Sequence, residues 1–293
     1  MLQLNNNAQF LGMDTPYEEA RVIWFGIPFD GTTSNRPGTR FAASAIRLES
    51  EGLETYSPLL DLDLEDAKIM DAGDVGLSIG DTPRVMAEIK EVTAQILADG
   101  KIPFMVGGEH LVTLPVVEAV YEKYPDMHII HFDAHTDLRD TFNNNKLSHA
   151  TVIRRIHDFL GDGRIFQFGI RSGTKEEFDF ARVHNHVYME PHTMNTLPEV
   201  IQSLKGKKVY VTIDLDCLDP SVFPGTGTPE PGGLTYREYQ QLFTQLKEAD
   251  LDIVGADIVE LSPHYDPTGV STVVGAKSLR DLSLVMDYKA KGE

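Results

Sequence analysis

Short, continuous runs of apolar and β-branched residues recur along the whole chain and predict its strands. Most of these runs do not alternate between apolar and polar positions, which is typical of strands that are covered on both faces of a parallel sheet. The eight predicted strands cover residues 22–26, 68–71, 102–107, 128–133, 164–169, 186–189, 208–215 and 253–259.

Amphipathic segments lie between several of these strands and predict helices. The clearest covers residues 83–98, where apolar side chains recur at every third or fourth position. Thr82 is the expected N-cap, Pro83 suits the first helical position, and Gly100 is expected to end the helix. The other predicted helices cover residues 114–124, 150–160, 197–204 and 236–248.

Strands that alternate with helices predict an α/β fold with a mostly parallel sheet and helices on both faces. No linker, repeat or low-complexity tract interrupts the pattern, so we expect a single domain over residues 1–293. Sheets of this kind bind ligands outside the carboxyl ends of their strands. Functional side chains are therefore expected where the predicted strands end.

Polar side chains follow three of the predicted strands at that edge. Asp133, His135 and Asp137 follow the strand that begins at residue 128, and an extended backbone would send these alternate residues to one side. Asp214 and Asp216 have the same spacing at the end of the strand that begins at residue 208, and His110 follows the strand that begins at residue 102. Together these side chains predict a metal site.

The charge of this predicted cluster indicates how many ions it holds. Four carboxylates and two imidazoles cannot be buried together unless cations neutralise them, and two divalent cations would balance four negative charges. Oxygen-rich ligands with some imidazole favour Mn²⁺ over zinc. The side chain of Cys217 has the opposite phase to Asp216, and His131 lies deeper in its strand, so both are expected to be core residues.

The overall composition excludes several other functions. The chain has 26 basic and 45 acidic residues, and its net charge of −19 disfavours binding to nucleic acid. There is one cysteine, no apolar run long enough to cross a membrane, and no secretory signal in residues 1–7. We therefore expect a cytoplasmic protein that binds neither nucleic acid nor membranes.

Several motifs, in order along nearly the whole chain, resemble the ureohydrolase family of arginases and agmatinases, and most closely its agmatinase branch. Early matches are residues 26–30 and 45–47, and the Gly-Ile-Arg segment 169–171 favours the agmatinase branch. The metal-site motifs that match are residues 107–110, 132–137, 148–149, 214–220, 225–229 and 257–263.

The resemblance implies a three-layer α/β/α fold with an eight-stranded parallel sheet, and a homo-oligomer, either a trimer or a hexamer. It also implies that two Mn²⁺ are bound by a set of six side chains, namely His110, Asp133, His135, Asp137, Asp214 and Asp216. The implied reaction is hydrolysis of a small cationic guanidino substrate to urea and an amine, with agmatine giving putrescine and urea as the leading expectation.

The resemblance also assigns roles to three side chains. His149 is expected to relay a proton to the leaving amine, a role that the ordinary pKa of imidazole suits, and to contact the substrate. Asp137 is expected to orient the attacking hydroxide. Glu260 is expected to hold the guanidinium by charge-assisted hydrogen bonds and to share in catalysis.

Two alternatives remain open at this point. Arginase, guanidinobutyrase or formiminoglutamase activity would use the same metal chemistry, and the sequence does not identify the residues that bind the far end of the substrate. A metal-binding scaffold without activity would be expected to lack a metal ligand, His149 or Glu260, and all of these are present.

Overall fold

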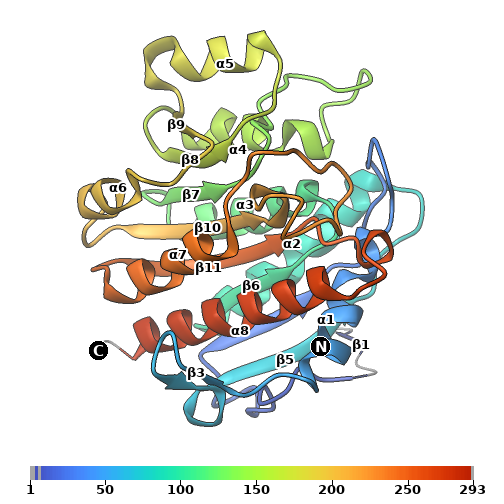
Figure 1. Cartoon of the computed structure of the whole chain (residues 1–293), viewed down its shortest axis with the longest axis vertical. Helices are drawn as coiled ribbons and strands as arrows, with labels where there is room; N and C mark the ends of the chain where they lie inside the picture. The colour runs from blue at the N-terminus through green and yellow to red at the C-terminus, as the bar shows by residue number, and fades with distance from the viewer. Residues whose placement is uncertain (1–3, 6–7, 292–293) are drawn as a thin grey trace.

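The computed structural model describes residues 4–5 and 8–291, which build one large twisted sheet between two layers of helices (Figure 1). The strand order is β1-β5-β2-β6-β11-β10-β7-β8-β9. Eight of these strands are parallel, and the short edge strand β1 is antiparallel to β5. The predicted three-layer α/β/α fold with an eight-stranded parallel sheet is therefore confirmed.

The eight predicted strands are all present, with shifts of a few residues at their ends. The strands of the large sheet are β1 (Leu4–Asn5), β2 (Val22–Gly26), β5 (Ile69–Val75), β6 (Ile102–Val106), β7 (His128–Phe132), β8 (Ile165–Ile170), β9 (Tyr188–Pro191), β10 (Lys208–Asp214) and β11 (Asp252–Val259). A separate small hairpin consists of β3 (Tyr56–Ser57) and β4 (Leu62–Asp63).

Two apolar clusters, one on each face of the sheet, hold the three layers together. On one face, the sheet packs against α1 (Ala42–Ser50), α6 (Leu197–Ser203), α7 (Tyr236–Glu248) and α8 (Val270–Ala290). On the other face it packs against α2 (Thr82–Ala98), α3 (Thr113–Lys123), α4 (Val152–Leu160) and α5 (Lys175–Arg182). Burial on both faces explains why the strand sequences are continuously apolar.

All five predicted helices are present, but α2 is capped differently from the prediction. The carboxylate of Asp81 accepts a hydrogen bond from the backbone N–H of Arg84, so Asp81 is the N-cap and Thr82 is already helical. A carboxylate at this position also interacts favourably with the positive end of the helix dipole. Gly100 follows the helix with a φ of +74°, as its predicted role in ending the helix requires.

Helices α1, α5 and α8 were not predicted. Helix α8 has buried residues on every side, because it packs against α1, α7, β2 and β11. Its sequence mixes Ser, Thr, Asp and Arg with apolar residues and has no single apolar stripe. Tertiary packing, rather than an amphipathic pattern, therefore stabilises this helix.

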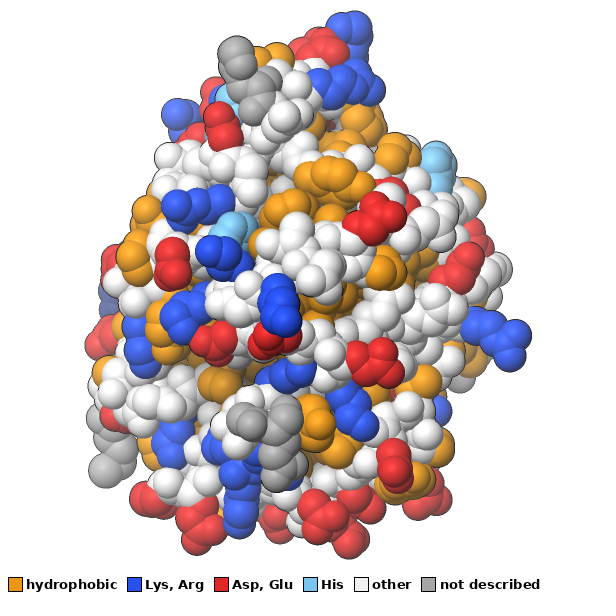
Figure 2. All heavy atoms as spheres, turned by 90° about the vertical axis from the view of Figure 1, so that its left-hand side faces the viewer, with side chains coloured by type: hydrophobic (Ala, Val, Ile, Leu, Met, Phe, Trp, Pro, Cys, Tyr) orange, Lys and Arg blue, Asp and Glu red, His pale blue; other side chains and the backbone are white. Residues whose placement is uncertain are grey.

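The face that carries the amino ends of the parallel strands has basic and acidic side chains interspersed over its surface (Figure 2).

No described helix combines the length and apolar character that are needed to cross a membrane. Residues 1–7 were expected to contain no secretory signal. Of these residues, Met1–Gln3, Asn6 and Asn7 lie outside the described part of the chain.

Candidate metal centre

The polar side chains that follow β6, β7, β10 and β11 meet at the carboxyl edge of the sheet. These four strands are neighbours in the order β6-β11-β10-β7, so their ends lie side by side. The connection from β6 passes directly against the loop after β2 at Gly108. A Cβ atom at Gly108 would lie 1.7 Å from the carbonyl oxygen of Phe29, so this close approach requires glycine.

The first part of the cluster surrounds the imidazole of His110. Its Nδ1 atom lies 3.2 Å from Oδ2 of Asp133, 3.1 Å from Oδ2 of Asp137 and 3.4 Å from Oδ2 of Asp214. Nδ1 is fully buried, yet no described residue forms a hydrogen bond with it in acceptable geometry. The nitrogen and the three carboxylate oxygens lie close together, but they do not form hydrogen bonds with each other. Metal ligands are expected to be arranged in this way.

The second part of the cluster surrounds His135. Its Nδ1 atom lies 3.3 Å from Oδ1 of Asp133 and 3.1 Å from Oδ2 of Asp216. The carboxylate of Asp133 thus has one oxygen in each part of the cluster. A shared carboxylate of this kind can bridge two cations, as in two-metal sites.

Hydrogen bonds behind His110 fix its tautomer. The hydroxyl of Thr212 donates to Oδ1 of Asp257 at 2.6 Å, so it can only accept from Nε2 of His110, which lies 3.1 Å away. Nε2 of His110 therefore carries a proton, and Nδ1 is the nitrogen that faces the three carboxylates and is available to a metal ion. This is how protein groups outside the ligand shell orient a metal-binding imidazole.

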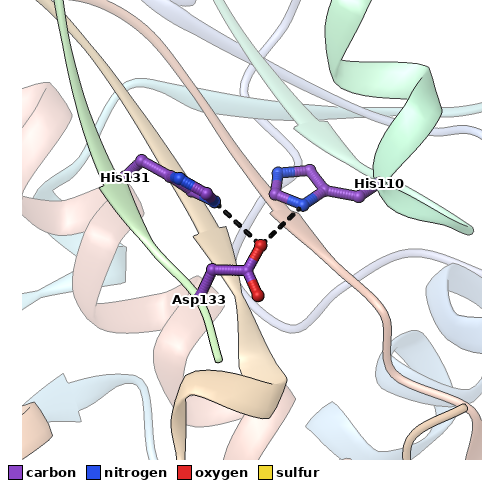
Figure 3. Close-up of side chains that lie close together, drawn as sticks. All are labelled: His110, His131 and Asp133. Carbon is purple, nitrogen blue, oxygen red and sulfur yellow. Dashed lines mark hydrogen bonds and ion pairs between the residues drawn. The ribbon is translucent and has the colours of Figure 1, made fainter. Parts of the chain in front are cut away.

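His131 is a buried histidine, as predicted, and it also contacts the cluster through Asp133 (Figure 3). Its Nε2 atom lies 3.0 Å from Oδ2 of Asp133, while the side-chain amide of Gln167 donates to its Nδ1 and to the carbonyl of Thr136. The proton of His131 must then be on Nε2, where it is donated to Asp133. Both ring nitrogens are satisfied, so His131 is a buried donor to Asp133 and has no lone pair for a metal ion.

Loops, rather than extended strands, bring these side chains together. Strand β7 ends at Phe132, and Asp137 has a φ of +51°. Asp216 lies in the 3₁₀ turn η6 (Leu215–Cys217), and its backbone N–H donates to Oδ1 of Asp214 at 2.9 Å. The predicted convergence is therefore correct, but the explanation by strand alternation alone is wrong.

When no cation is present, burial raises the pKa values of two carboxylates of the cluster, whereas the imidazoles of His110, His131 and His135 hold the pKa of Asp133 well below its usual range in spite of its burial. Burial and the neighbouring carboxylate of Asp133 raise the pKa of Asp137 to about 7. Burial and the carboxylates of Asp216 and Asp133 raise the pKa of Asp214 well above its usual range. The cluster thus carries more negative charge than the protein alone neutralises, and bound cations would restore the ionised forms.

A cavity of about 160 Å³ opens directly onto the cluster. Its lining includes His110, His135, Asp137, Asp214, Ser34, Thr136, Arg139, Phe142, His149, Ser172, Glu177, Thr228 and Glu260. This volume admits a slender small molecule and excludes a macromolecule. Because both carboxylates and imidazoles face the cavity, a cationic ligand would be attracted to it.

Glu260 and His149 both line this cavity. Oε1 of Glu260 accepts a hydrogen bond of 2.7 Å from the backbone N–H of His110, which orients the carboxylate. His149 begins the 3₁₀ turn η4 (His149–Thr151), which is capped by Ser148. Nε2 of His149 is buried, and none of the described residues forms a hydrogen bond with it.

The pKa of His149 is lower than the ordinary imidazole value that the prediction assumed. In the metal-free protein, burial, together with the positive charges of His110 and His135, lowers the pKa of His149 to about 4. The imidazole is therefore neutral near pH 7, and it can accept a proton before it donates one.

Arg171 is a supporting residue whose role the sequence motif did not reveal. Its guanidinium donates to the backbone carbonyls of Gly169, Asp216, Cys217, Leu218 and Glu230. These bonds tie the turn that carries Asp216 to the end of β8. Cys217 itself is a free cysteine that is fully buried in the apolar cluster, as predicted.

Comparison with known proteins places the fold and this cluster in a defined class. The arginase family profile matches residues 20–284. An agmatinase from Bacillus anthracis is 44% identical over 275 residues, which cover 94% of this chain and 95% of the relative.

Two solved structures agree with this result. A crystal structure provisionally assigned as an agmatinase from Clostridium difficile has 61% identity and a TM-score of 0.92, and the match covers 94% of this chain and 99% of that one. The crystal structure of the agmatine ureohydrolase of Thermoplasma volcanium has 35% identity and a TM-score of 0.88, with 99% and 97% of the two chains covered.

The fold, the carboxylate–imidazole cluster and the cavity above it define a metal-dependent hydrolase that acts on guanidino C–N bonds. The chain belongs to the arginase family.

Proposed function

We propose that the protein hydrolyses agmatine to putrescine and urea, with two Mn²⁺ bound by His110, Asp133, His135, Asp137, Asp214 and Asp216. The observation that carries this proposal is the unbonded, buried Nδ1 of His110 among three carboxylate oxygens at the floor of a cavity. The whole chain acts as one domain in this proposal. The similarity to an agmatinase and to an agmatine ureohydrolase supports the substrate.

The donor set fits a pair of divalent cations. Six side chains offer mainly oxygen with two nitrogens, which suits Mn²⁺ better than a thiolate-preferring metal. When bound, such ions lower the pKa of a water molecule and so supply the nucleophile near neutral pH.

Glu260 positions the guanidinium in this proposal. One of its oxygens is engaged by the N–H of His110, and the carboxylate lines the cavity next to the cluster. Ionised in the presence of the cations, it would accept charge-assisted hydrogen bonds from the planar guanidinium. The central carbon of the substrate would then lie over the metal ligands, and Asp137 would accept a hydrogen bond from the attacking oxygen.

His149 transfers a proton to the leaving amine. Its neutral imidazole, with the unpartnered Nε2, is suited to take a proton from the reacting groups and to deliver it to the amine nitrogen as the C–N bond breaks. The protonated amine cannot re-attack urea, so the reaction proceeds to products.

The decisive experiment is a urea-release assay of the Mn²⁺-loaded protein on agmatine, arginine, guanidinobutyrate and formiminoglutamate, with formamide measured for the last. We expect the highest kcat/KM on agmatine. The double variant Asp214→Asn/Asp216→Asn, which removes two carboxylates from the cluster, is the matched control and is expected to be inactive. Activity confined to another substrate would overturn the choice of agmatine, and no turnover of any of them would overturn the enzyme proposal.

We propose in addition that the protein is a cytoplasmic homo-oligomer, either a trimer or a hexamer. Multi-angle light scattering of the purified protein tests the oligomeric state, and a monomeric mass would contradict it.

A further inference from the structure

Glu109 directly precedes His110, but its side chain contacts Thr32 and Thr33, and it has no role in the chemistry described above. It is completely buried, at 0% exposure, between the end of β6 and the loop that follows β2. Oε2 of Glu109 accepts hydrogen bonds from the backbone N–H of Thr32 at 2.8 Å and from the hydroxyl of Thr33 at 3.0 Å. Oε1 accepts a very short hydrogen bond from the hydroxyl of Thr32.

The hydroxyl of Thr32 extends this contact to His149. A hydroxyl has one proton, and that of Thr32 is donated to Glu109, so its oxygen is left as an acceptor. The backbone N–H of His149 donates to this oxygen at 3.2 Å, across 117 positions in the sequence. Three segments, those that contain Thr32, Glu109 and His149, are thereby joined at one hydroxyl.

This junction determines where the imidazole of His149 can lie. His149 is the first residue of the turn η4, and its N–H is one of the donors that such a turn leaves without an internal partner. Ser148 caps the next N–H, that of Ala150, so Thr32 provides a separate anchor for His149. Glu109 precedes His110 in the chain. The anchor therefore fixes the position of His149 relative to a residue of the metal centre.

We propose that Thr32, held by Glu109, is a positioning residue that places the imidazole of His149 over the reacting groups. This inference rests on the proposed function, because the acceptor of the proton from His149 is the leaving amine of that reaction. Thr33 contacts the same carboxylate, but none of the described hydrogen bonds joins it to His149. Its hydroxyl lies 3.0 Å from Oε2 of Glu109 and 3.1 Å from the carbonyl oxygen of Asp30, and it can donate its one proton to either. It is therefore the natural control.

The test compares Thr32→Val, Thr32→Ser and Thr33→Val in the Mn²⁺-loaded protein. Val has the shape of Thr but lacks the hydroxyl, so Thr32→Val should lower kcat on agmatine by about 10- to 100-fold, as expected for a misplaced catalytic group, with little change in KM. Thr32→Ser keeps the hydroxyl and should restore kcat to within about threefold of wild type, and Thr33→Val should do the same. Metal content should match wild type in all three. Thr32→Val and Thr33→Val should lower the melting temperature by similar amounts, because each removes one hydrogen bond to the buried carboxylate of Glu109.

Two results would overturn the inference: equal kcat in Thr32→Val and Thr33→Val, or a loss in Thr32→Val that Thr32→Ser does not rescue. If the wild-type protein releases no urea from agmatine, the proposed function fails instead. Crystal structures of wild type and Thr32→Val then decide the inference by themselves, because the ring of His149 must move by about 1 Å or more relative to His110 in the variant. An unmoved ring would contradict it.

Discussion

The side-chain amide of Gln167 donates a hydrogen bond of 3.0 Å to Nδ1 of His131 and thereby forces the proton of that imidazole onto the nitrogen that faces Asp133. Gln167 lies in β8, the strand beside β7, and is completely buried. A glutamine with no contact to the six candidate ligands thus sets the hydrogen bonding of the carboxylate that both halves of the cluster share.

We predict that Gln167→Leu weakens Mn²⁺ binding by about 10- to 100-fold, because the donor that orients His131 toward Asp133 is lost. Leu has a similar size, so the sheet should remain packed. Isothermal titration calorimetry with Mn²⁺ measures the effect. The control is Gln202→Leu, at an exposed position in α6. Unchanged affinity in Gln167→Leu would show that His131 does not need this partner.

Glu260→Gln should raise KM for agmatine and lower kcat/KM by about 100-fold or more, since a neutral amide cannot pair with a guanidinium as a carboxylate does. The amide oxygen can still accept from the N–H of His110, so the loop should keep its conformation. Steady-state kinetics and metal analysis of the same sample test both points. Loss of Mn²⁺ from this variant would contradict a role for Glu260 in substrate binding.

His149→Asn should lower kcat by about 100-fold or more while KM and metal content stay near wild type, as expected when a proton-transfer group is removed. Asn retains the backbone N–H that Thr32 accepts and a polar side chain at the wall of the cavity. Single-turnover measurements with agmatine locate the loss in the chemical step. A variant with an unchanged rate of urea formation would require a different proton donor.

Removal of the metal should make stability depend on pH in a defined direction. The pKa of Asp137 is about 7 in the metal-free folded state, above the usual value for Asp, so the folded state binds more protons than the unfolded state between about pH 4 and 7. The raised pKa values of Asp214, His110 and His135 act in the same direction and extend the effect above pH 7. The lowered pKa values of His149 and His131 act in the opposite direction, but only below about pH 6.5, where an unfolded imidazole is protonated. Stability is therefore lost as the pH rises above about 6.5.

Thermal unfolding of the chelator-treated protein from about pH 6.5 to about pH 8.5 should show a falling melting temperature, and addition of Mn²⁺ should restore it most strongly at the alkaline end. Mn²⁺ binding should also release protons, because it displaces them from the carboxylates and imidazoles. A metal-free protein that is more stable at the alkaline end would contradict the arrangement of the cluster.

The sequence predicted the strands well because burial on both faces produces continuous apolar runs that are visible in a short window. Helix α8 has no such local signature, since its packing partners α1 and β2 lie more than 200 positions away. For the same reason the motifs drew attention to the six side chains that the structure brings together, but not to Gln167 or Thr32, and the motif that contains Arg171 did not reveal its role. The effect of these three residues depends on hydrogen bonds to distant segments, and a hydrogen bond leaves no periodic pattern in a sequence.

The position of β11 in the middle of the sheet has a consequence for biosynthesis. β11 is the last strand of the chain, yet it pairs with β6 on one side and β10 on the other, and no other strand joins these two halves. His110 follows the first half, while the five other candidate ligands follow strands of the second. While the ribosome is still making the segments before residue 252, the halves cannot be joined through this strand. All six candidate ligands can therefore come together only after β11 has been synthesised and has paired with β6 and β10.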